Sequence, residues 1–313
     1  MSKILSVVVP CYNEEEAIPY FYQAMEEIQT KIEYTFEYIF VNDGSSDNTL
    51  AVLRELYQKN PESVRFLSFS RNFGKEAGIY AGLQEATGEL VTIMDVDLQD
   101  PPELLIEMIT LIEQKEYDCI GSRRISRVGE PPIRSLFAKL FYNLQNKISD
   151  THMVDGARDY RLMTRQMTDA VLQMSEYNRF SKGLFEWVGF KTHYLEFENV
   201  ERQHGQTSWS FWSLFKYSID GIINFSAMPL RIATVFGSIF SVLSFIGILF
   251  IVFRALVNGI DTPGWASTAC IILFIGGIQL LALGVIGEYI GKIFLETKNR
   301  PLYIIKEKNP AAK

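Results

Sequence analysis

Two long apolar runs near the C-terminal end constrain the fold of this chain most. Residues 232–253 contain no charged side chain, and neither do residues 265–287. As helices that rise about 1.5 Å per residue, both runs are long enough to cross a hydrocarbon layer of about 30 Å. The alternative is a buried helix in a soluble domain, but two such runs separated by 11 residues favour a transmembrane hairpin.

Basic residues around the two runs indicate how the hairpin is oriented. Arg254 is the one basic residue between the runs, whereas six Lys and Arg residues follow at 292–313. Because basic residues concentrate on the cytoplasmic side of membrane spans, the N-terminal part and the tail are both predicted to be cytoplasmic.

The charge is unevenly distributed along the chain. Residues 1–122 carry 8 Lys and Arg against 22 Asp and Glu, whereas residues 123–313 carry 22 against 15. The basic second half fits an anionic lipid surface, and the acidic first part faces the cytosol. Three cysteines at positions 11, 119 and 270 lack metal-ligand spacing and are expected to be free thiols in a reducing compartment.

The first 122 residues alternate between strand and helix patterns. Four β-rich runs, "ILSVVV", "FEYIFV", "VRFLSF" and "LVTIMD", each precede a segment with helical periodicity. This alternation predicts a mostly parallel sheet with helices on both faces, in which ligands bind beyond the carboxyl ends of the strands. The polar clusters "PCYNEE", "NDGSSD", "SRNFGK" and "DVDLQD" lie at those ends, so one pocket could gather all four.

Two further segments have an amphipathic helical pattern, residues 131–148 and 209–225. Core-facing helices of a soluble domain give the same pattern. Because Trp and Phe are abundant here and the second segment leads into a membrane run, we expect helices that lie in the cytoplasmic interface.

The cluster "DVDLQD" is the strongest candidate for a metal site. If Asp95 continues the preceding strand, its side chain and that of Asp97 point to the same side, and Gln99 offers a third oxygen. Mg²⁺ typically takes one or two protein carboxylates and completes its shell with substrate phosphates. Asp100 is instead expected to cap a helix that has Pro101 at its first position.

The first two clusters offer groups for a nucleotide. Asn13, Glu14 and Asp43 could hydrogen-bond a base or ribose, and Gly44 lets the backbone approach closely. A capped turn is the alternative for "NDGSSD". The sequence contains no GxxxxGK[ST] and no GxGxxG, so the usual P-loop and dinucleotide-binding fingerprints are absent.

Seven motifs together resemble the bacterial polyprenyl-phosphate glycosyltransferases. In order they are "VVVPCYNEE", "VNDGSSDNT", "SRNFGKEAG", "MDVDLQDPPE", "GSRR", "DYRLM" and "GEYIGKIFLETKNRPLY". These enzymes are family 2 glycosyltransferases related to dolichol-phosphate mannose synthase, and the resemblance is strongest to the undecaprenyl-phosphate (bactoprenol) glucosyltransferases. It covers nearly the whole chain.

The resemblance implies an α/β fold of the GT-A type and a division of the chain. Residues 1–208 would form the cytoplasmic catalytic domain, including an interfacial helix at about 131–148. A juxtamembrane amphipathic helix (209–230), a transmembrane hairpin (231–290) and a cytoplasmic tail (291–313) would follow. The implied reaction is metal-dependent, inverting transfer of a hexose, glucose as the first guess, from a UDP-sugar to undecaprenyl phosphate at the cytoplasmic membrane face.

The resemblance also implies roles for single residues. Pro10, Tyr12, Glu14 and Asp43 would hold the uracil end of the donor, with Lys75 near it. Asp95, Asp97 and Gln99 would bind Mg²⁺ or Mn²⁺ that bridges the diphosphate. Arg123 would meet the acceptor phosphate, Arg134 would be a second acceptor arginine, and Asp159 occupies the position often proposed as catalytic base.

A lipid phosphate hardly needs a base. The second pKa of a phosphomonoester is near 6, so the nucleophile is already an oxyanion at cytoplasmic pH. What the reaction needs is charge cancellation at the leaving diphosphate and at the acceptor. We therefore hypothesise that Asp159 orients Arg161, an arginine near the acceptor site, or a sugar hydroxyl.

Two rival functions are a processive polysaccharide synthase and a non-catalytic, nucleotide-binding membrane scaffold. The synthases carry a QxxRW motif that this sequence lacks, and the intact Asp95, Asp97 and Gln99 set argues against a scaffold. A flippase and a second copy of the chain are the protein partners considered. No nucleic-acid partner is expected.

Overall fold

The computed structural model describes residues 3–125, 146, 154–198, 223–224, 226–258 and 264–309. Arg134 and almost all of the amphipathic segments expected at 131–148 and 209–225 lie outside these residues. The expectations for these segments therefore stay predictions.

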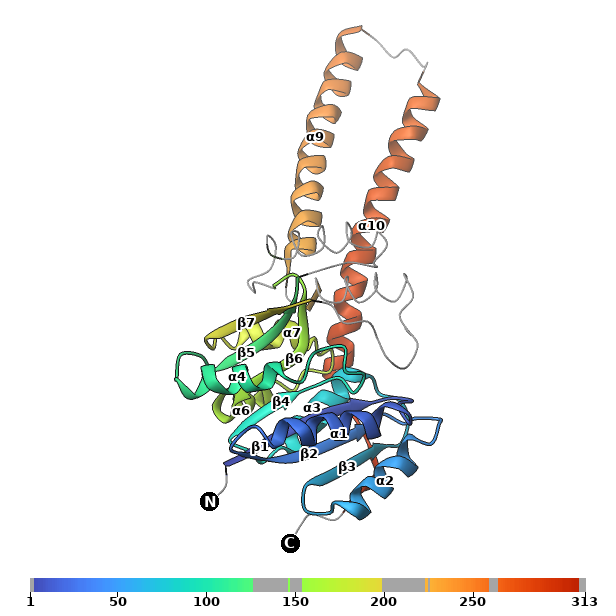
Figure 1. Cartoon of the computed structure of the whole chain (residues 1–313). Helices are drawn as coiled ribbons and strands as arrows, with labels where there is room; N and C mark the ends of the chain where they lie inside the picture. The colour runs from blue at the N-terminus through green and yellow to red at the C-terminus, as the bar shows by residue number, and fades with distance from the viewer. Residues whose placement is uncertain are drawn as a thin grey trace.

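A single eight-stranded sheet organises the described part of the N-terminal domain, in the order β7-β5-β6-β4-β1-β2-β3-β8 (Figure 1). Strands β1, β2, β3 and β4 pair in parallel, as the alternation predicts, and β5 is parallel to β7. Antiparallel pairing joins β6 to β4 and β5, and β8 to β3. The strands are β1 (Lys3–Cys11), β2 (Tyr34–Asn42), β3 (Val64–Phe69), β4 (Leu90–Ile93), β5 (Cys119–Arg124), β6 (Ala157–Thr164), β7 (Thr192–Phe197) and β8 (Ile305–Lys308).

Helices cover both faces of this sheet, so the predicted layered α/β architecture is confirmed. Alternate side chains of β1 point to opposite faces: Leu5, Val7 and Val9 join one hydrophobic core, and Val8 joins the other. The first core includes side chains of α1 (Ala17–Gln29), α2 (Thr49–Lys59) and α4 (Leu104–Glu113). The second includes those of α3 (Lys75–Glu85), α6 (Arg165–Gln173) and α7 (Ser181–Trp187).

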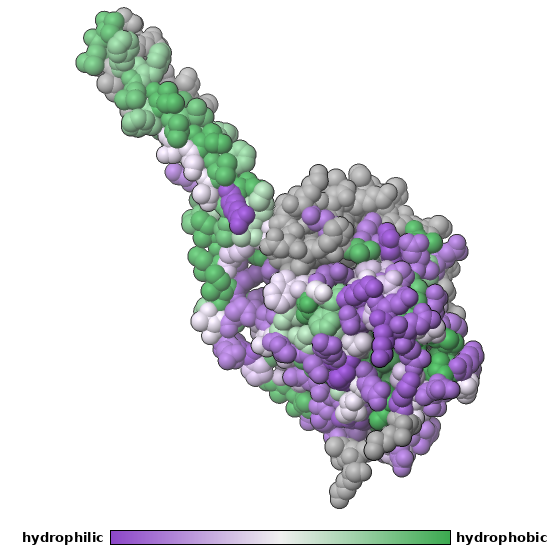
Figure 2. Space-filling view, turned by 90° about the vertical axis from the view of Figure 1, so that its left-hand side faces the viewer, coloured by the Kyte–Doolittle hydropathy of each residue, from purple (hydrophilic) through white to green (hydrophobic). Residues whose placement is uncertain are grey.

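Two long helices, α9 (Met228–Asn258) and α10 (Trp265–Thr297), project from this domain as a hairpin (Figure 1). They contain the predicted runs, and windows at Met228–Gly247 and Phe274–Thr297 are long and apolar enough to cross a membrane. Hydrophobic side chains dominate the outer part of the hairpin, whereas hydrophilic ones dominate the visible face of the N-terminal domain (Figure 2). A hairpin with such an exterior suits a lipid environment.

The tail after α10 returns to the sheet. Strand β8 pairs antiparallel with the edge strand β3, and the ring of Tyr303 stacks on Phe69 at 4.8 Å between centroids. The Oδ1 atom of Asn309 accepts a hydrogen bond of 2.7 Å from the amide of Phe66. The segments before and after the hairpin therefore belong to one domain, which places them on the same side of any membrane that the hairpin crosses.

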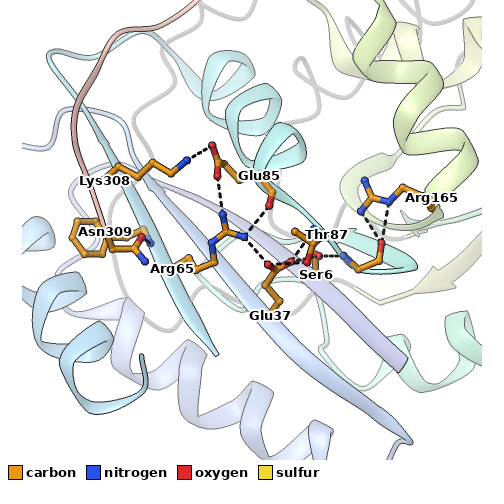
Figure 3. Close-up of polar contacts among 10 residues, drawn as sticks. Ser6, Glu37, Arg65, Glu85, Thr87, Arg165, Lys308 and Asn309 are labelled. Atoms are coloured by element: carbon orange, nitrogen blue, oxygen red, sulfur yellow. Dashed lines mark hydrogen bonds and ion pairs between the residues drawn. The ribbon is translucent and has the colours of Figure 1, made fainter. Parts of the chain in front are cut away.

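A buried polar network ties the sheet to α3 and to the tail (Figure 3). Arg65 on β3 donates to Glu37 of β2 at 2.6 Å and to Glu85 at the end of α3 at 2.8 Å. Glu85 also accepts from Lys308 of β8 at 2.6 Å. Glu37 is held further by Ser6 and Thr87. Because the charged groups around Arg65 are largely buried, its loss would leave Glu37 without its counter-charge and Glu85 paired with Lys308 alone.

Arg65→Met is therefore expected to lower the free energy of unfolding by about 3 kcal/mol. Denaturant titration of the full chain in detergent would measure this loss. Arg54→Met is the matched control, because Arg54 also pairs with a glutamate, Glu307, but its side chain is 50% exposed. Such a surface pair contributes about 1 kcal/mol or less. Equal losses in the two variants would contradict the structural role of Arg65.

Candidate functional site

The candidate site lies where strands β1, β2 and β4 end, beside the start of α3. The three strands are parallel neighbours, so the residues that follow them share one edge of the sheet. Strand β6 brings in a further carboxylate. It runs antiparallel to β4 with Ile93 opposite Arg161, so Asp159 lies opposite the segment that contains Asp95.

Lys75, the first residue of α3, joins these two carboxylates. Its Nζ atom lies 2.6 Å from an oxygen of Asp95 and 2.5 Å from an oxygen of Asp159. Burial alone would raise the pKa of Asp159, but the charges of Lys75, Lys182 and Arg161 hold it well below its usual value. Burial lowers the pKa of Lys75, but the two aspartates more than offset this and raise it overall. The lysine and Asp159 therefore stay ionised at neutral pH.

This geometry corrects the hypothesis that Asp159 orients Arg161. The Asp159 carboxylate contacts Lys75, whereas the Nε atom of Arg161 donates to the main-chain oxygen of Asp159 at 3.3 Å. The Arg161 guanidinium is buried and stacks on the ring of Phe185 at 3.8 Å. The structure thus makes Lys75 the partner of the Asp159 side chain.

The turn after β4 also differs from the prediction in one respect. Strand β4 ends at Ile93, so Asp95 does not continue it. The chain turns instead, and Leu98 adopts a left-handed conformation with φ 54°. Asp97 is 9% exposed, and its Oδ1 atom accepts from the amide of Gln99 at 3.2 Å.

Asp100 does not cap a helix, in contrast to the prediction. Helix α4 begins at Leu104 with Glu103 as its N-cap residue. Asp100 is buried and accepts from Nε of Arg158 at 3.0 Å, while Nη2 of the same arginine lies 3.4 Å from Oε1 of Gln99. Burial raises the pKa of Asp100 to about 6, against the lowering effect of Arg158.

The donor set fits a divalent cation that arrives with its substrate. Within the described ranges no three His, Cys, Asp or Glu side chains are placed to hold a metal by themselves. Asp95, Asp97 and Gln99 offer two carboxylates and an amide oxygen, which suits Mg²⁺ or Mn²⁺ if a diphosphate supplies the remaining ligands. To bind such a cation, Asp95 would have to contact the metal in addition to Lys75 or in place of it.

Two residues that are predicted to bind the nucleotide also connect three loops through hydrogen bonds. Asp43 is buried, and its carboxylate accepts from the amides of Phe73 at 2.6 Å and Gly74 at 2.9 Å. The Oδ1 atom of Asn13 accepts from the amide of Ser46 at 2.9 Å. Both candidate residues thus have a structural role whatever they bind.

Gly44 permits a close backbone approach, as predicted, but the group that lies close to it is the main chain of Arg71 and not a ligand. Its φ is 64°, and a Cβ atom there would lie 2.3 Å from the carbonyl carbon of Arg71. Tyr12 is 47% exposed, so its ring is available to a ligand. Pro10 is half-buried at the end of β1, and the amide of Glu14 donates to Thr49 at 2.9 Å.

Arg123 lies at the end of β5, and β6 separates it from β4. Its Nε atom donates to the main-chain oxygen of Asp155 at 2.9 Å, and its Nη1 atom lies 3.1 Å from Glu196. The side chain stays 38% exposed. Arg134, the second expected acceptor arginine, falls outside the described residues.

Arg158 and Lys182 are two cations that the sequence analysis missed. Arg158 contacts Gln99 and Asp100, and Lys182 donates to the main-chain oxygen of Ala157 at 2.9 Å. Arg158 directly precedes Asp159, and Lys182 lies on α7, more than 20 residues further on. Their partners depend on the antiparallel placement of β6, which no local pattern indicates.

Comparisons with known proteins identify the family. A family model described as "Glycosyl transferase family 2" matches residues 6–172. The chain belongs to glycosyl transferase family 2.

This family 2 enzyme is also 41% identical over 302 residues to the prophage bactoprenol glucosyl transferase homolog of Escherichia coli K12, covering 96% of the chain and 98% of the relative. It is 41% identical over 303 residues to the bactoprenol glucosyl transferase of Shigella phage SfII, covering 97% of both proteins. The predicted family resemblance and the prediction of an enzyme are confirmed.

Solved structures with a related arrangement are more distant from this family 2 glycosyltransferase. The mannosyltransferase PcManGT of Pyrobaculum calidifontis, solved with GDP-Man and Mn²⁺, has a TM-score of 0.48 and 17% identity, covering 70% of this chain and 63% of that one. Glucosyl-3-phosphoglycerate synthase of Mycobacterium tuberculosis, solved with Mn²⁺, UDP-glucose and phosphoglyceric acid, has a TM-score of 0.47 and 17% identity, covering 71% and 78%.

Proposed function

We propose that this enzyme transfers a hexose, glucose as the first candidate, from a UDP-sugar to undecaprenyl phosphate. The observation that carries the proposal is the 41% identity to a bactoprenol glucosyl transferase over 97% of the chain. The similarity extends through the apolar hairpin as well as the catalytic domain, so it includes the part that would meet a lipid acceptor.

The charges of the site support this reaction. Asp95, Asp97 and Gln99 would hold Mg²⁺ or Mn²⁺, which would stabilise the departing diphosphate when bound. Lys75 would hold Asp95 and Asp159 in place and would keep Asp159 ionised. Arg123, with an exposed guanidinium, would bind the acceptor phosphate. Pro10, Tyr12, Asn13, Glu14, Asp43 and Gly44 would shape the donor end, with Arg134 assigned to the acceptor by resemblance alone.

Asp159 would act as a positioning residue in this scheme. Its pKa is held well below the usual value, mainly by Lys75 against the effect of burial, so its carboxylate has little affinity for a proton. The acceptor phosphate has a second pKa near 6 and needs no base at cytoplasmic pH. A single in-line attack at the anomeric carbon would invert it, so an α-linked donor would give a β-linked lipid phosphate sugar.

The proposed location is the cytoplasmic face of the plasma membrane. The hairpin of residues 231–290 would anchor the catalytic domain of residues 1–208, with residues 209–230 at the interface. Pairing of β8 with β3 supports a tail, 291–313, on the same side as the catalytic domain. The basic residues after the hairpin support a cytoplasmic side for both.

Labelled nucleotide sugars and undecaprenyl phosphate, added to membranes with the enzyme, test the function. We expect label from UDP-glucose in the organic extract, and none when the lipid acceptor is omitted. Label in an insoluble polymer would favour a processive synthase, and donor binding without transfer would favour a scaffold. Either result would contradict the proposed reaction.

Removal of divalent cations is expected to abolish transfer. Chelation with EDTA should stop labelling of the lipid, because Asp95, Asp97 and Gln99 cannot by themselves neutralise a leaving diphosphate. Addition of Mg²⁺ or Mn²⁺ in excess should restore it. Full activity in EDTA would contradict the metal assignment but leave the transferase assignment standing.

A further inference from the structure

Glu76 joins the start of α3 to the start of α7. It directly follows Lys75 in the first turn of α3, and its side chain is half-buried. Its Oε2 atom accepts from the amide of Ser181 at 3.0 Å and from the hydroxyl of the same serine. Ser181 is the first residue of α7 and is 1% exposed. These two hydrogen bonds connect residues that are 105 positions apart in the chain.

The lysines next to these two residues both act on Asp159. Lys75 precedes Glu76, and its Nζ atom lies 2.5 Å from an oxygen of Asp159. Lys182 follows Ser181, and its Nζ atom donates at 2.9 Å to a main-chain oxygen of β6 that lies two residues before Asp159. Burial alone would raise the pKa of Asp159, and the charges of both lysines lower it. The contact between Glu76 and Ser181 therefore connects the backbone positions of two cations that act on one carboxylate.

The negative charge of Glu76 does not account for its place near Asp159. Burial raises the pKa of Glu76, the hydrogen bonds from Ser181 lower it, and the charge of Asp159 raises it. Nearby carboxylates disfavour each other's ionised form. What Glu76 supplies is therefore an oxygen that accepts hydrogen bonds, and not a charge that helps Asp159.

Other contacts already hold α7 against the rest of the domain. Phe185 of α7 packs in the same hydrophobic core as Ala77 of α3. The loop before α7 is fixed by the hairpin, because Glu296 of α10 accepts from the amides of Tyr177 and Asn178 at 2.9 and 3.0 Å. Loss of the two hydrogen bonds at the start of α7 should thus leave this helix folded and shift only its first residues.

We propose that Glu76 is a positioning residue for the transfer reaction and acts through Ser181 on Lys182. Its two hydrogen bonds fix the first turn of α7, so that Lys182 remains beside Asp159. A misplacement of about 1 Å can lower a catalytic rate about a hundredfold, even when the altered residue is far from the reacting atoms. This inference rests on the proposed function, because it gives Glu76 a part in that transfer.

Transfer of labelled glucose to undecaprenyl phosphate by Glu76→Met and Glu76→Gln tests the proposal, with kcat expressed per folded full-length enzyme. Methionine removes the acceptor oxygen and should lower kcat about tenfold or more. Glutamine has no charge but keeps an amide oxygen for Ser181, so kcat should stay within about threefold of the wild type. Glu107→Met, which replaces an exposed glutamate in the first turn of α4, is the matched control and should leave kcat unchanged.

A double variant distinguishes positioning of Lys182 from a general loss of structure. Lys182→Met alone should lower kcat, since it removes a cation that acts on Asp159. Addition of Glu76→Met to Lys182→Met should then lower kcat by less than about threefold, because the group that Glu76 positions is already absent. Losses that multiply in the double variant would overturn the proposal, and so would a Glu76→Gln variant as impaired as Glu76→Met.

The wild-type rate separates this inference from the proposed function. If the wild type transfers glucose to the lipid and Glu76→Met is equally active, only the role of Glu76 is overturned. If the wild type transfers no glucose, the proposed function fails and the role of Glu76 fails with it.

Discussion

Transfer activity is expected to fall about a thousandfold when Asp97 is replaced by asparagine, because the change removes charge stabilisation at the leaving group. Asp97 is a nearly buried carboxylate in the turn after β4. Asparagine keeps its shape and an oxygen that can accept from the Gln99 amide, so the turn should persist. The loss should appear in kcat for labelled lipid at saturating donor and metal, with the protein still folded and membrane-bound.

Asp169→Asn is a suitable control for the Asp97 variant. Asp169 is an exposed carboxylate on α6 that pairs with Arg165, far from the strand ends of the candidate site in sequence. Its substitution removes the same charge and should leave kcat unchanged. An Asp97→Asn protein with wild-type activity would show that this carboxylate is not a metal ligand.

Replacement of Lys75 by methionine is expected to lower transfer about a hundredfold or more, because it removes the charge that holds two site carboxylates together. The loss of this cation leaves Asp95 and Asp159 as like charges that no longer share a partner. Lys31→Met, which replaces an exposed lysine in the turn after α1, should retain activity. An unchanged rate in Lys75→Met would remove this lysine from the proposed site.

The pH dependence of the Lys75 variant tests the role of Asp159. In the wild type the pKa of Asp159 is depressed, so its ionised form is present above the ordinary pKa of about 3.9 and is lost only as pH falls well below that value. The fall in the wild-type transfer rate at low pH should therefore follow protonation of the acceptor phosphate, near pH 6. In Lys75→Met the pKa of Asp159 should rise, because burial is then opposed only by Lys182 and Arg161, so any loss of activity from protonation of Asp159 should begin at a higher pH than in the wild type.

Comparison of the Asp159→Asn and Arg123→Ala variants distinguishes a positioning role of Asp159 from a role as the catalytic base. If Asp159 positions Lys75 and the acceptor, Asp159→Asn should lose activity to an extent comparable with Arg123→Ala. If Asp159→Asn lost far more than Arg123→Ala and recovered none of it at raised pH, Asp159 would instead act as the base.

The sequence predicts the first half of the sheet well because its signals are local. Alternating apolar runs mark β1 to β4, and helical periodicity marks the helices between them. The antiparallel strands β6 and β8 are different, since each is defined by its partner. Residues 305–308 form a strand because they meet the free edge of β3, whereas their sequence indicates only part of a basic tail.

The candidate site, too, is predicted from the sequence only where its signals are local. The spacing of Asp95, Asp97 and Gln99 and their place after a strand predict a cluster of oxygens, and the structure places them in one turn. The pairing of Lys75 with Asp159 joins residues 84 positions apart, and Arg158 reaches Asp100 across 58. Asp100 was therefore predicted as a helix cap, because the cation that accounts for its burial lies on a strand that no local pattern reveals.

Mass spectrometry of the lipid product, after incubation with UDP-glucose and undecaprenyl phosphate, tests the central claim most directly. Attack by the acceptor phosphate on the sugar predicts a product with the mass of the acceptor plus one anhydrohexose, and with a single phosphorus atom. A lipid with two phosphorus atoms, a series of products with several hexoses, or no hexose on the lipid at all would contradict the proposed reaction.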